Sequence, residues 1–125
     1  MRFLSILTLC LICCSGMAQS KSKYLKIAGE WKGVINVEGD PVEVVFHIKY
    51  NGSEVSGTMD IPDQNAFGLK IDEITFVDGD LKMTSKIVEG TYEGVVNYNK
   101  VEGKWKQFGK TFDLLLKKKL RKRSS

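Results

Sequence analysis

Residues 42–61, VEVVFHIKYNGSEVSGTMDI, contain two segments of alternating apolar and polar residues joined by Asn51-Gly52. Every second residue of both segments is apolar or glycine: Val42, Val44, Phe46, Ile48 and Tyr50, then Val55, Gly57, Met59 and Ile61. This period is typical of a β-strand with one buried face. Asn-Gly is the strongest short hairpin signal in the chain, because both residues tolerate positive φ. The stretch therefore predicts two antiparallel strands.

The same alternation extends over residues 29–118, and turn signals interrupt it at short intervals. We expect eight strands, at residues 31–37, 42–50, 54–61, 71–77, 81–88, 91–97, 101–107 and 111–117. A polar loop and a linker separate the third strand from the fourth, and only residues 21–28 are expected to form a helical turn. Short strands at regular spacing predict an all-β fold, either a sandwich or a barrel.

Glycines decide between the sandwich and the barrel. Four of them stand mid-strand on the apolar face: Gly33, Gly57, Gly94 and Gly103. Glycine there costs stability unless the sheet bends tightly or a large side chain lies over it. Both needs arise in a small closed barrel, where Trp31 and Trp105 are large enough to fill the space. We therefore predict an eight-stranded, mostly antiparallel barrel that is lipocalin- or calycin-like in shape.

The inward faces of these strands supply the candidate ligand-binding residues. They are Trp31, Phe46, Tyr50, Met59, Phe76, Met83, Tyr92 and Trp105, and we expect Ile87 and Phe112 to point inward as well. An eight-stranded barrel can be filled by its own side chains, which would leave only a pocket at the mouth. The alternative is that the mid-strand glycines open a cleft for a small apolar ligand.

The first 18 residues have the pattern of a signal peptide. An apolar run follows Arg2, and Gly16 and Ala18 precede a cut before Gln19. The run is too short to span a membrane, and Cys13 stands where a lipoprotein signal needs a small residue, so we expect cleavage rather than lipidation. The chain then divides into a signal peptide (1–18), a lead-in (19–28), a barrel (29–118) and a basic tail (119–125). We expect the protein in the periplasm or outside a Gram-negative bacterium.

Cleavage would remove all three cysteines, and with them every disulfide and thiolate site. Six of the 19 basic residues lie in residues 117–123, so the barrel itself is acidic. An acidic body without basic and aromatic residues interleaved on one face argues against nucleic-acid binding. The tail is expected either to make a weak contact with an anionic membrane surface or to be a solvated terminus.

The sequence contains no pattern for catalysis, a metal or a cofactor. His47, the only histidine, is expected on the solvated outer face. Glycosidase chemistry needs two carboxylates across a cleft. Nothing places Asp60, Asp63, Asp72 and Glu73 in that way, and an Asp in a turn usually bonds its own backbone. We expect that the protein is not an enzyme.

The polar cluster after the third strand is expected to lie at the rim of the barrel. Pro62 should end strand pairing because it has no N–H group. Asp63 and Gln64 should cap exposed backbone groups there, and we expect Gln107 near the same rim. These four residues form a candidate contact loop for a partner.

Three motifs carry a family resemblance: Ser56-Gly57, Pro62-Asp63-Gln64 and Gly103-x-Trp105-x-Gln107. With their surroundings they resemble the small β-barrel region that precedes the hydrolase domain in secreted bacterial α/β-hydrolases. The resemblance covers residues 29–118 and implies a small β-barrel fold and a secreted location. No hydrolase domain or nucleophile elbow follows in this chain, so hydrolase activity is not carried over.

The start of the barrel is similar to that of lipocalins and calycins. Gly29-x-Trp31 has the same form, and in those proteins a basic residue near the C-terminus sometimes covers the tryptophan. The resemblance would assign this role to Lys117.

Two functions follow as expectations. The first is a non-catalytic secreted module that binds a small hydrophobic or amphipathic molecule at the barrel mouth. The alternative is an interaction or accessory domain for a separately encoded envelope hydrolase. An exposed apolar patch would favour the second function, and the outer-face residues expected to form it are Val34, Val45, Val95 and Leu115.

Overall fold

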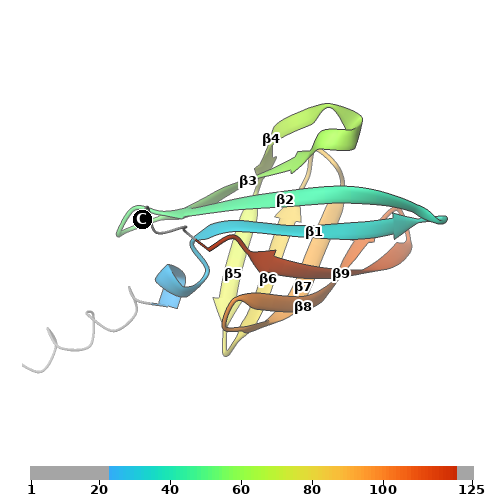
Figure 1. Ribbon diagram of the computed structural model, residues 1–125. Coiled ribbons are helices and arrows are strands. Elements are labelled where there is room, and N and C mark those ends of the chain that lie inside the picture. The colour runs from blue at the N-terminus through green and yellow to red at the C-terminus, as the bar shows by residue number, and fades with distance from the viewer. Residues whose placement is uncertain (1–22, 121–125) are drawn as a thin grey trace, which may run out of the picture.

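The computed structural model describes residues 23–120, so the predicted signal peptide and residues 121–125 of the basic tail lie outside the described residues. The described chain is one antiparallel sheet of nine strands that curls into a nearly closed barrel (Figure 1). The strands are β1 (Gly29–Val37), β2 (Asp40–Tyr50), β3 (Val55–Ile61), β4 (Ala66–Ile71), β5 (Glu73–Val77), β6 (Asp80–Ser85), β7 (Gly90–Asn97), β8 (Lys100–Gln107) and β9 (Lys110–Lys118). Two short 3-10 helices, η1 (Lys23–Lys26) and η2 (Pro62–Gln64), precede β1 and follow β3.

The order of strands in the sheet is β4-β3-β2-β1-β9-β8-β7-β6-β5. The two edge strands, β4 and β5, are consecutive in sequence and are separated only by Asp72. At Asp72 the chain passes from β4, which pairs with β3, to β5, which pairs with β6. The Asp72 N–H donates to the Thr84 carbonyl at 2.7 Å. Ser85, the one buried polar residue among those described, donates from its hydroxyl to the Lys70 carbonyl at 2.7 Å. These bonds bring the two edges together and nearly close the barrel.

The predicted all-β barrel is confirmed, and it contains one more strand than expected. The additional strand is β4, which lies where the sequence predicts a linker. Its alternation is weak, because Phe67 and Gly68 are both exposed and only Ile71 is buried. The predicted strand at residues 71–77 is therefore the end of β4 together with β5.

One further expectation about local structure is wrong. The alternation places Ile87 inside, but β6 ends at Ser85 and Ile87 is 67% exposed in the following turn. The hairpin predicted at Asn51-Gly52 is confirmed, since β2 and β3 pair antiparallel on either side of it. Within its loop only Gly52 has a positive φ, at 97°, and the Asn51 side chain accepts bonds from the N–H groups of Ser53 and Glu54.

The interior of the barrel is filled by side chains. Large side chains of this interior include Trp31, Phe46, Met59, Met83 and Tyr92, each at most 1% exposed. The mid-strand glycines make room for neighbours and do not open a cleft. A Cβ on Gly103 would lie 2.4 Å from the Glu93 carbonyl oxygen, and one on Gly33 would lie 2.4 Å from that of Leu115. Of the two alternatives that the sequence left open, the interior filled by its own side chains is therefore the one observed.

Tyr92 carries the most buried hydroxyl of the core. The hydroxyl donates to the Leu114 carbonyl at 2.8 Å, and the Val101 carbonyl lies 3.3 Å away. Burial raises the pKa of the Tyr92 phenol well above its ordinary value, because the charged form would lose its hydration.

This raised pKa predicts a loss of stability in alkali. Unfolded chains release the Tyr92 proton near pH 10, whereas the folded chain keeps it. The contribution of this proton to the free energy of unfolding is therefore complete below pH 10 and falls as the pH rises further. Each pH unit above that point should cost about 1.4 kcal/mol of unfolding free energy from this residue. Urea unfolding at several alkaline pH values measures the slope. Tyr92→Phe should flatten it, whereas Tyr98→Phe, at an 88% exposed position, should leave it unchanged.

Candidate functional site

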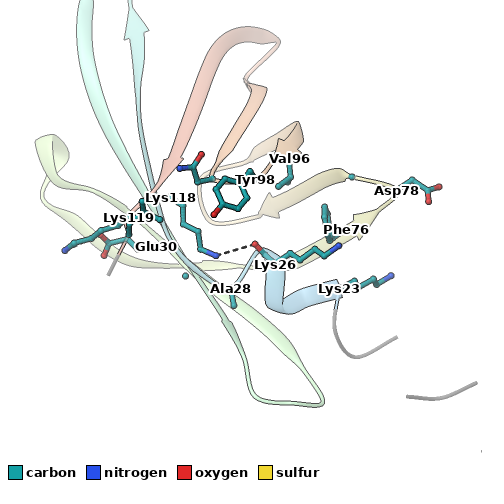
Figure 2. Close-up of a pocket in the computed structure, with 14 residues that line it drawn as sticks. Lys23, Lys26, Ala28, Glu30, Phe76, Asp78, Val96, Tyr98, Lys118 and Lys119 are labelled. Atoms are coloured by element: carbon teal, nitrogen blue, oxygen red, sulfur yellow. Dashed lines mark hydrogen bonds and ion pairs between the residues drawn. The ribbon is translucent and has the colours of Figure 1, made fainter. Parts of the chain in front are cut away.

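A groove opens at the end of the barrel where η1 begins and β9 ends (Figure 2). Its volume is about 1730 Å³. It is lined by residues from five parts of the chain: Lys23, Lys26 and Ala28 around η1; Gly29 and Glu30 of β1; Phe76, Asp78 and Gly79 at the β5–β6 turn; Val96, Tyr98 and Asn99 at the β7–β8 turn; and Lys118, Lys119 and Leu120 after β9. The groove corresponds to the pocket that the sequence predicts at the mouth of a filled barrel.

One wall of the groove depends on the contact between Lys118 and Trp31. The Lys118 ammonium lies 5.5 Å from the centre of the Trp31 ring and 3.4 Å from the Lys26 carbonyl oxygen. The Trp31 indole donates to the Ile27 carbonyl at 2.8 Å, which fixes η1 against the barrel. Gly29 has φ +136°, and a Cβ there would lie 2.8 Å from Cε of Lys118. Because Gly29 has no Cβ, the Lys118 side chain can run past it to the Trp31 ring.

The prediction that Lys117 covers Trp31 is wrong by one residue. In the β1–β9 ladder Trp31 stands opposite Lys118, and Lys117 stands opposite Lys32. Successive side chains of a strand point to opposite faces. Lys117 therefore points outward and is exposed.

Part of the groove lining is apolar. Figure 2 shows Phe76, Val96 and Tyr98 in this lining. Phe76 belongs to the core and is 7% exposed, whereas Tyr98 is 88% exposed at the tip of its turn. Tyr98 holds a positive φ of 62°, which turns the chain sharply between β7 and β8. Leu120, which is 65% exposed, adds to the apolar lining.

The charged lining of the groove is mainly cationic. Four lysines, Lys23, Lys26, Lys118 and Lys119, face two carboxylates, Glu30 and Asp78. Glu30 is paired with Lys119 at 3.8 Å. Within residues 23–120, no ion pair involves Lys23 or Lys26. The charges of the lining therefore favour an anionic group in the groove.

Most of the predicted interior residues lie away from this groove. Phe76 is the one member of that set that lines it. Trp31, Phe46, Met59, Met83, Tyr92 and Trp105 are buried in a single core, where Phe46 packs on Tyr92 at 5.7 Å between ring centres. Tyr50 is partly buried and packs against Tyr24 at 5.7 Å. The lining residues in turns were not predicted from the sequence, although Tyr98 in a turn and the lysines of the predicted helical turn were visible signals.

Two of the predicted rim residues, Asp63 and Gln107, bind backbone groups through their side chains. Pro62 begins η2 and ends β3, and the Asp63 carboxylate accepts a bond from the Glu43 N–H at 3.1 Å. Gln64 is exposed. Gln107 instead joins Trp105 Nε1 (3.1 Å) to the Val88 carbonyl (2.6 Å). No hydrogen bond in the described part of the chain connects Gln107 with η2.

Two of the other acidic candidates are also tied to backbone, whereas Glu73 is exposed. Asp72 accepts from the Lys86 N–H, and Asp60 accepts from the Gly68 N–H at 2.8 Å. Within residues 23–120, no cluster of three or more His, Cys, Asp or Glu side chains could hold a metal ion. No helix of this region is long and apolar enough to span a membrane.

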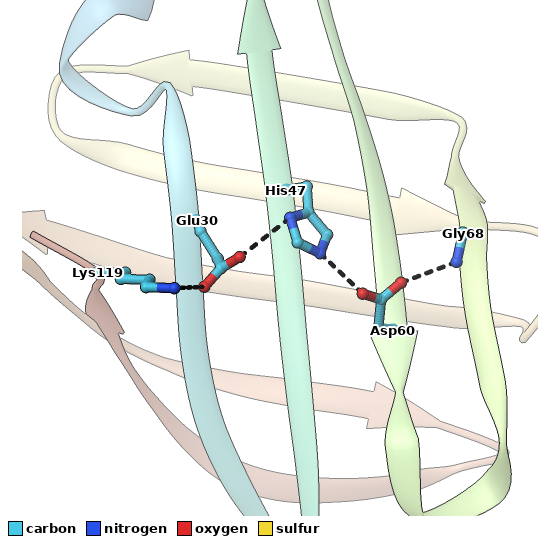
Figure 3. A network of polar contacts seen from close by, with 5 residues as sticks. All are labelled: Glu30, His47, Asp60, Gly68 and Lys119. Atoms are coloured by element: carbon cyan, nitrogen blue, oxygen red, sulfur yellow. Dashed lines mark hydrogen bonds and ion pairs between the residues drawn. The ribbon is translucent and has the colours of Figure 1, made fainter. Parts of the chain in front are cut away.

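His47 lies on the outer face, as predicted, but it is part of a polar row (Figure 3). Its Nε2 is 2.8 Å from Asp60 on β3, and its Nδ1 is 3.5 Å from Glu30 on β1. The Gly68 N–H bond, together with the interaction with His47, holds the pKa of the Asp60 carboxyl below its ordinary value. The row thus links the β3–β4 edge of the sheet to Glu30 in the groove.

The lowered pKa of Asp60 predicts a stability effect in acid. A carboxyl with a depressed folded pKa stabilises the fold above its ordinary pKa of 3.8, and this contribution is lost as the pH falls through the folded value. At neutral pH Asp60→Asn should lower the unfolding free energy by about 1 kcal/mol, and the difference should vanish in acid. Chemical denaturation across this pH range measures it. Asp113→Asn, at a 90% exposed side chain paired with Lys104, should change little.

No family model, curated protein or solved structure matches this chain. The resemblance to the barrel that precedes secreted α/β-hydrolases therefore stays a prediction.

Proposed function

We propose that the protein is an exported, non-catalytic module that binds a small amphipathic molecule at the groove end of the barrel. The observation that carries the proposal is the groove itself, whose lining combines apolar side chains, the exposed Tyr98 and Leu120 among them, with four lysines. The leader-like sequence of residues 1–18 supports export. The interior is a poor alternative site, because a ligand there would have to displace residues that are at most 1% exposed.

The lining favours a ligand with an apolar body and an anionic head. Phe76, Val96 and Tyr98 offer apolar and aromatic contact area. Lys23 and Lys26 line the same groove, and each has three N–H donors for a carboxylate or phosphate. A cationic amphiphile would find the same apolar contacts, but it would meet four lysines and only two acids.

Titration with decanoate and with decyltrimethylammonium tests this selection, because the two probes differ mainly in the charge of the head. We expect decanoate to bind more tightly and to shift the NMR signals of Phe76, Val96 and Tyr98. Tyr98→Ala should weaken decanoate binding about tenfold through lost apolar contact. Phe108→Ala is the matched control, since Phe108 is a 72% exposed aromatic residue in the β8–β9 turn at the other end. Equal binding of both probes, or signal shifts confined to other surfaces, would contradict the proposal.

The accessory-domain alternative is favoured by one observation. A second hollow of about 600 Å³ lies on the outer face between β1 and β9, where Val34 and Leu115 are 51% and 44% exposed. Val45 does not extend this patch, because it is buried at 7% exposure, contrary to expectation. A photo-crosslinker at position 34, activated in the native envelope, should give an adduct of hydrolase size if this function is correct. An adduct-free result would argue against it.

A further inference from the structure

We propose that the groove end docks on an anionic lipid bilayer, the surface that would supply the amphipathic ligand. The supply of ligand rests on the proposed function, whereas docking is a separate property of the surface.

Four exposed apolar residues surround the groove, and each comes from a different segment. They are Leu25 in η1 (61% exposed), Val77 at the end of β5 (57%), Tyr98 between β7 and β8 (88%) and Leu120 after β9 (65%). Tyr98 and Leu120 line the groove directly, and the neighbours of Leu25 and Val77 in the chain line it as well. Tyrosine and leucine at the rim of a concave surface suit the boundary between lipid headgroups and acyl chains.

Exposed apolar residues alone do not distinguish the groove end from the opposite end of the barrel as the membrane-binding surface. The opposite end carries Phe67, Ile87 and Phe108, which are 61%, 67% and 72% exposed. The connections there, at residues 38–40, 62–65, 86–89 and 108–110, contain four acids and two lysines. A bilayer with a negative surface would repel this end, so charge has to decide the orientation.

Charge favours the groove end. The segments at this end, residues 23–28, 51–54, 78–80, 98–100 and 117–120, contain six lysines and three acids, and Glu30 in the groove lining adds a fourth acid. Each lysine near an anionic bilayer contributes about 1 kcal/mol of attraction. The lysine stems can also lie along the apolar rim while their ammonium groups stay at the headgroups. In this orientation the groove opens toward the lipid, where an anionic amphiphile resides.

Co-sedimentation with vesicles tests the docking. One set of vesicles is phosphatidylcholine alone, and the other is phosphatidylcholine mixed with phosphatidylglycerol. We expect binding to the mixed vesicles only, and weaker binding as salt screens the charges. Tyr98→Ser with Leu120→Ser should reduce the binding on the order of tenfold, and Lys23→Gln with Lys26→Gln should also reduce it.

The matched control is Ile87→Ser with Phe108→Ser at the opposite end, which should bind the mixed vesicles like the unchanged chain. Equal loss in this control would overturn the proposal. So would full binding by both groove-end variants, which would assign any vesicle contact to residues outside the groove. Circular dichroism confirms that each variant folds.

The decanoate titration separates the two proposals. Decanoate binding without vesicle binding would overturn the docking and leave the proposed function standing. Vesicle binding that depends on Tyr98 and Leu120, without decanoate binding, would support the docking and overturn the proposed function. Loss of both would contradict both.

Discussion

Replacing Trp31 by alanine should lower the free energy of unfolding by about 3–5 kcal/mol, which is the range for deleting a large buried aromatic side chain. Trp31 is fully buried, and the cavity would lie beneath Lys118 and next to η1. The substitution also removes the indole N–H bond to the Ile27 carbonyl, so η1 loses its anchor. Urea unfolding followed by circular dichroism measures the change.

Trp31→Phe separates the two effects, because phenylalanine keeps most of the apolar volume and lacks the N–H donor. It should cost less than Trp31→Ala while still increasing hydrogen exchange at Ile27 and Ala28, whose N–H groups bond to the Tyr24 carbonyl in the η1 turn. A Trp31→Ala protein as stable as the original would contradict the structure of the core at this point.

Gly103→Ala should lower the free energy of unfolding by about 3 kcal/mol, at the upper end of what overpacking normally costs. Gly103 stands opposite Gly94 in the β7–β8 ladder, and the two backbones leave no space for a methyl group. The new Cβ would lie 2.4 Å from the Glu93 carbonyl oxygen, 2.6 Å from the Tyr92 hydroxyl oxygen and 2.7 Å from the Gly94 Cα. Two of these atoms belong to backbone, so no side-chain rotation can relieve the contact.

Gly39→Asn is the control for the glycine prediction. Gly39 lies in the β1–β2 turn with φ +91°, and a Cβ there would have no neighbouring atom within 4 Å. Asparagine tolerates positive φ better than other side chains, so the stability should fall much less than in Gly103→Ala. Equal losses at the two positions would contradict the close approach of β7 and β8 as the cause of the Gly103→Ala loss, because the new side chain at Gly39 meets no neighbour.

The fold was predictable because its signal is local. Period-2 alternation assigned Trp31, Phe46 and Trp105 to the core, and all three are buried. That the mid-strand glycines need a reason in the packing also followed. The tryptophans expected to fill the space over them do not do so: Leu114 and Leu116 lie over Gly33, and Tyr92 lies over Gly103.

The parts that failed depend on contacts between distant segments. β4 has almost no alternation of its own, and its pairing with β3 and its closure through Ser85 set its conformation. The choice between Lys117 and Lys118 required the register of β1 against β9. The groove lining comes from η1, two turns and the segment after β9, so no single stretch of sequence carries its pattern.

The strand order has a consequence for how the chain folds. Strands β1–β4 and β5–β9 are two runs in which each strand pairs with its neighbour in sequence, so both can form from local hairpins. The runs meet at β1 and β9, whose ladder has two register pairs, Trp31 with Lys118 and Lys32 with Lys117. Joining them closes a loop of almost the whole domain, which is the entropically expensive step. The contact of Lys118 with Trp31 therefore lies at the junction of β1 and β9. We expect this junction to form last in folding and to open first when the barrel begins to unfold.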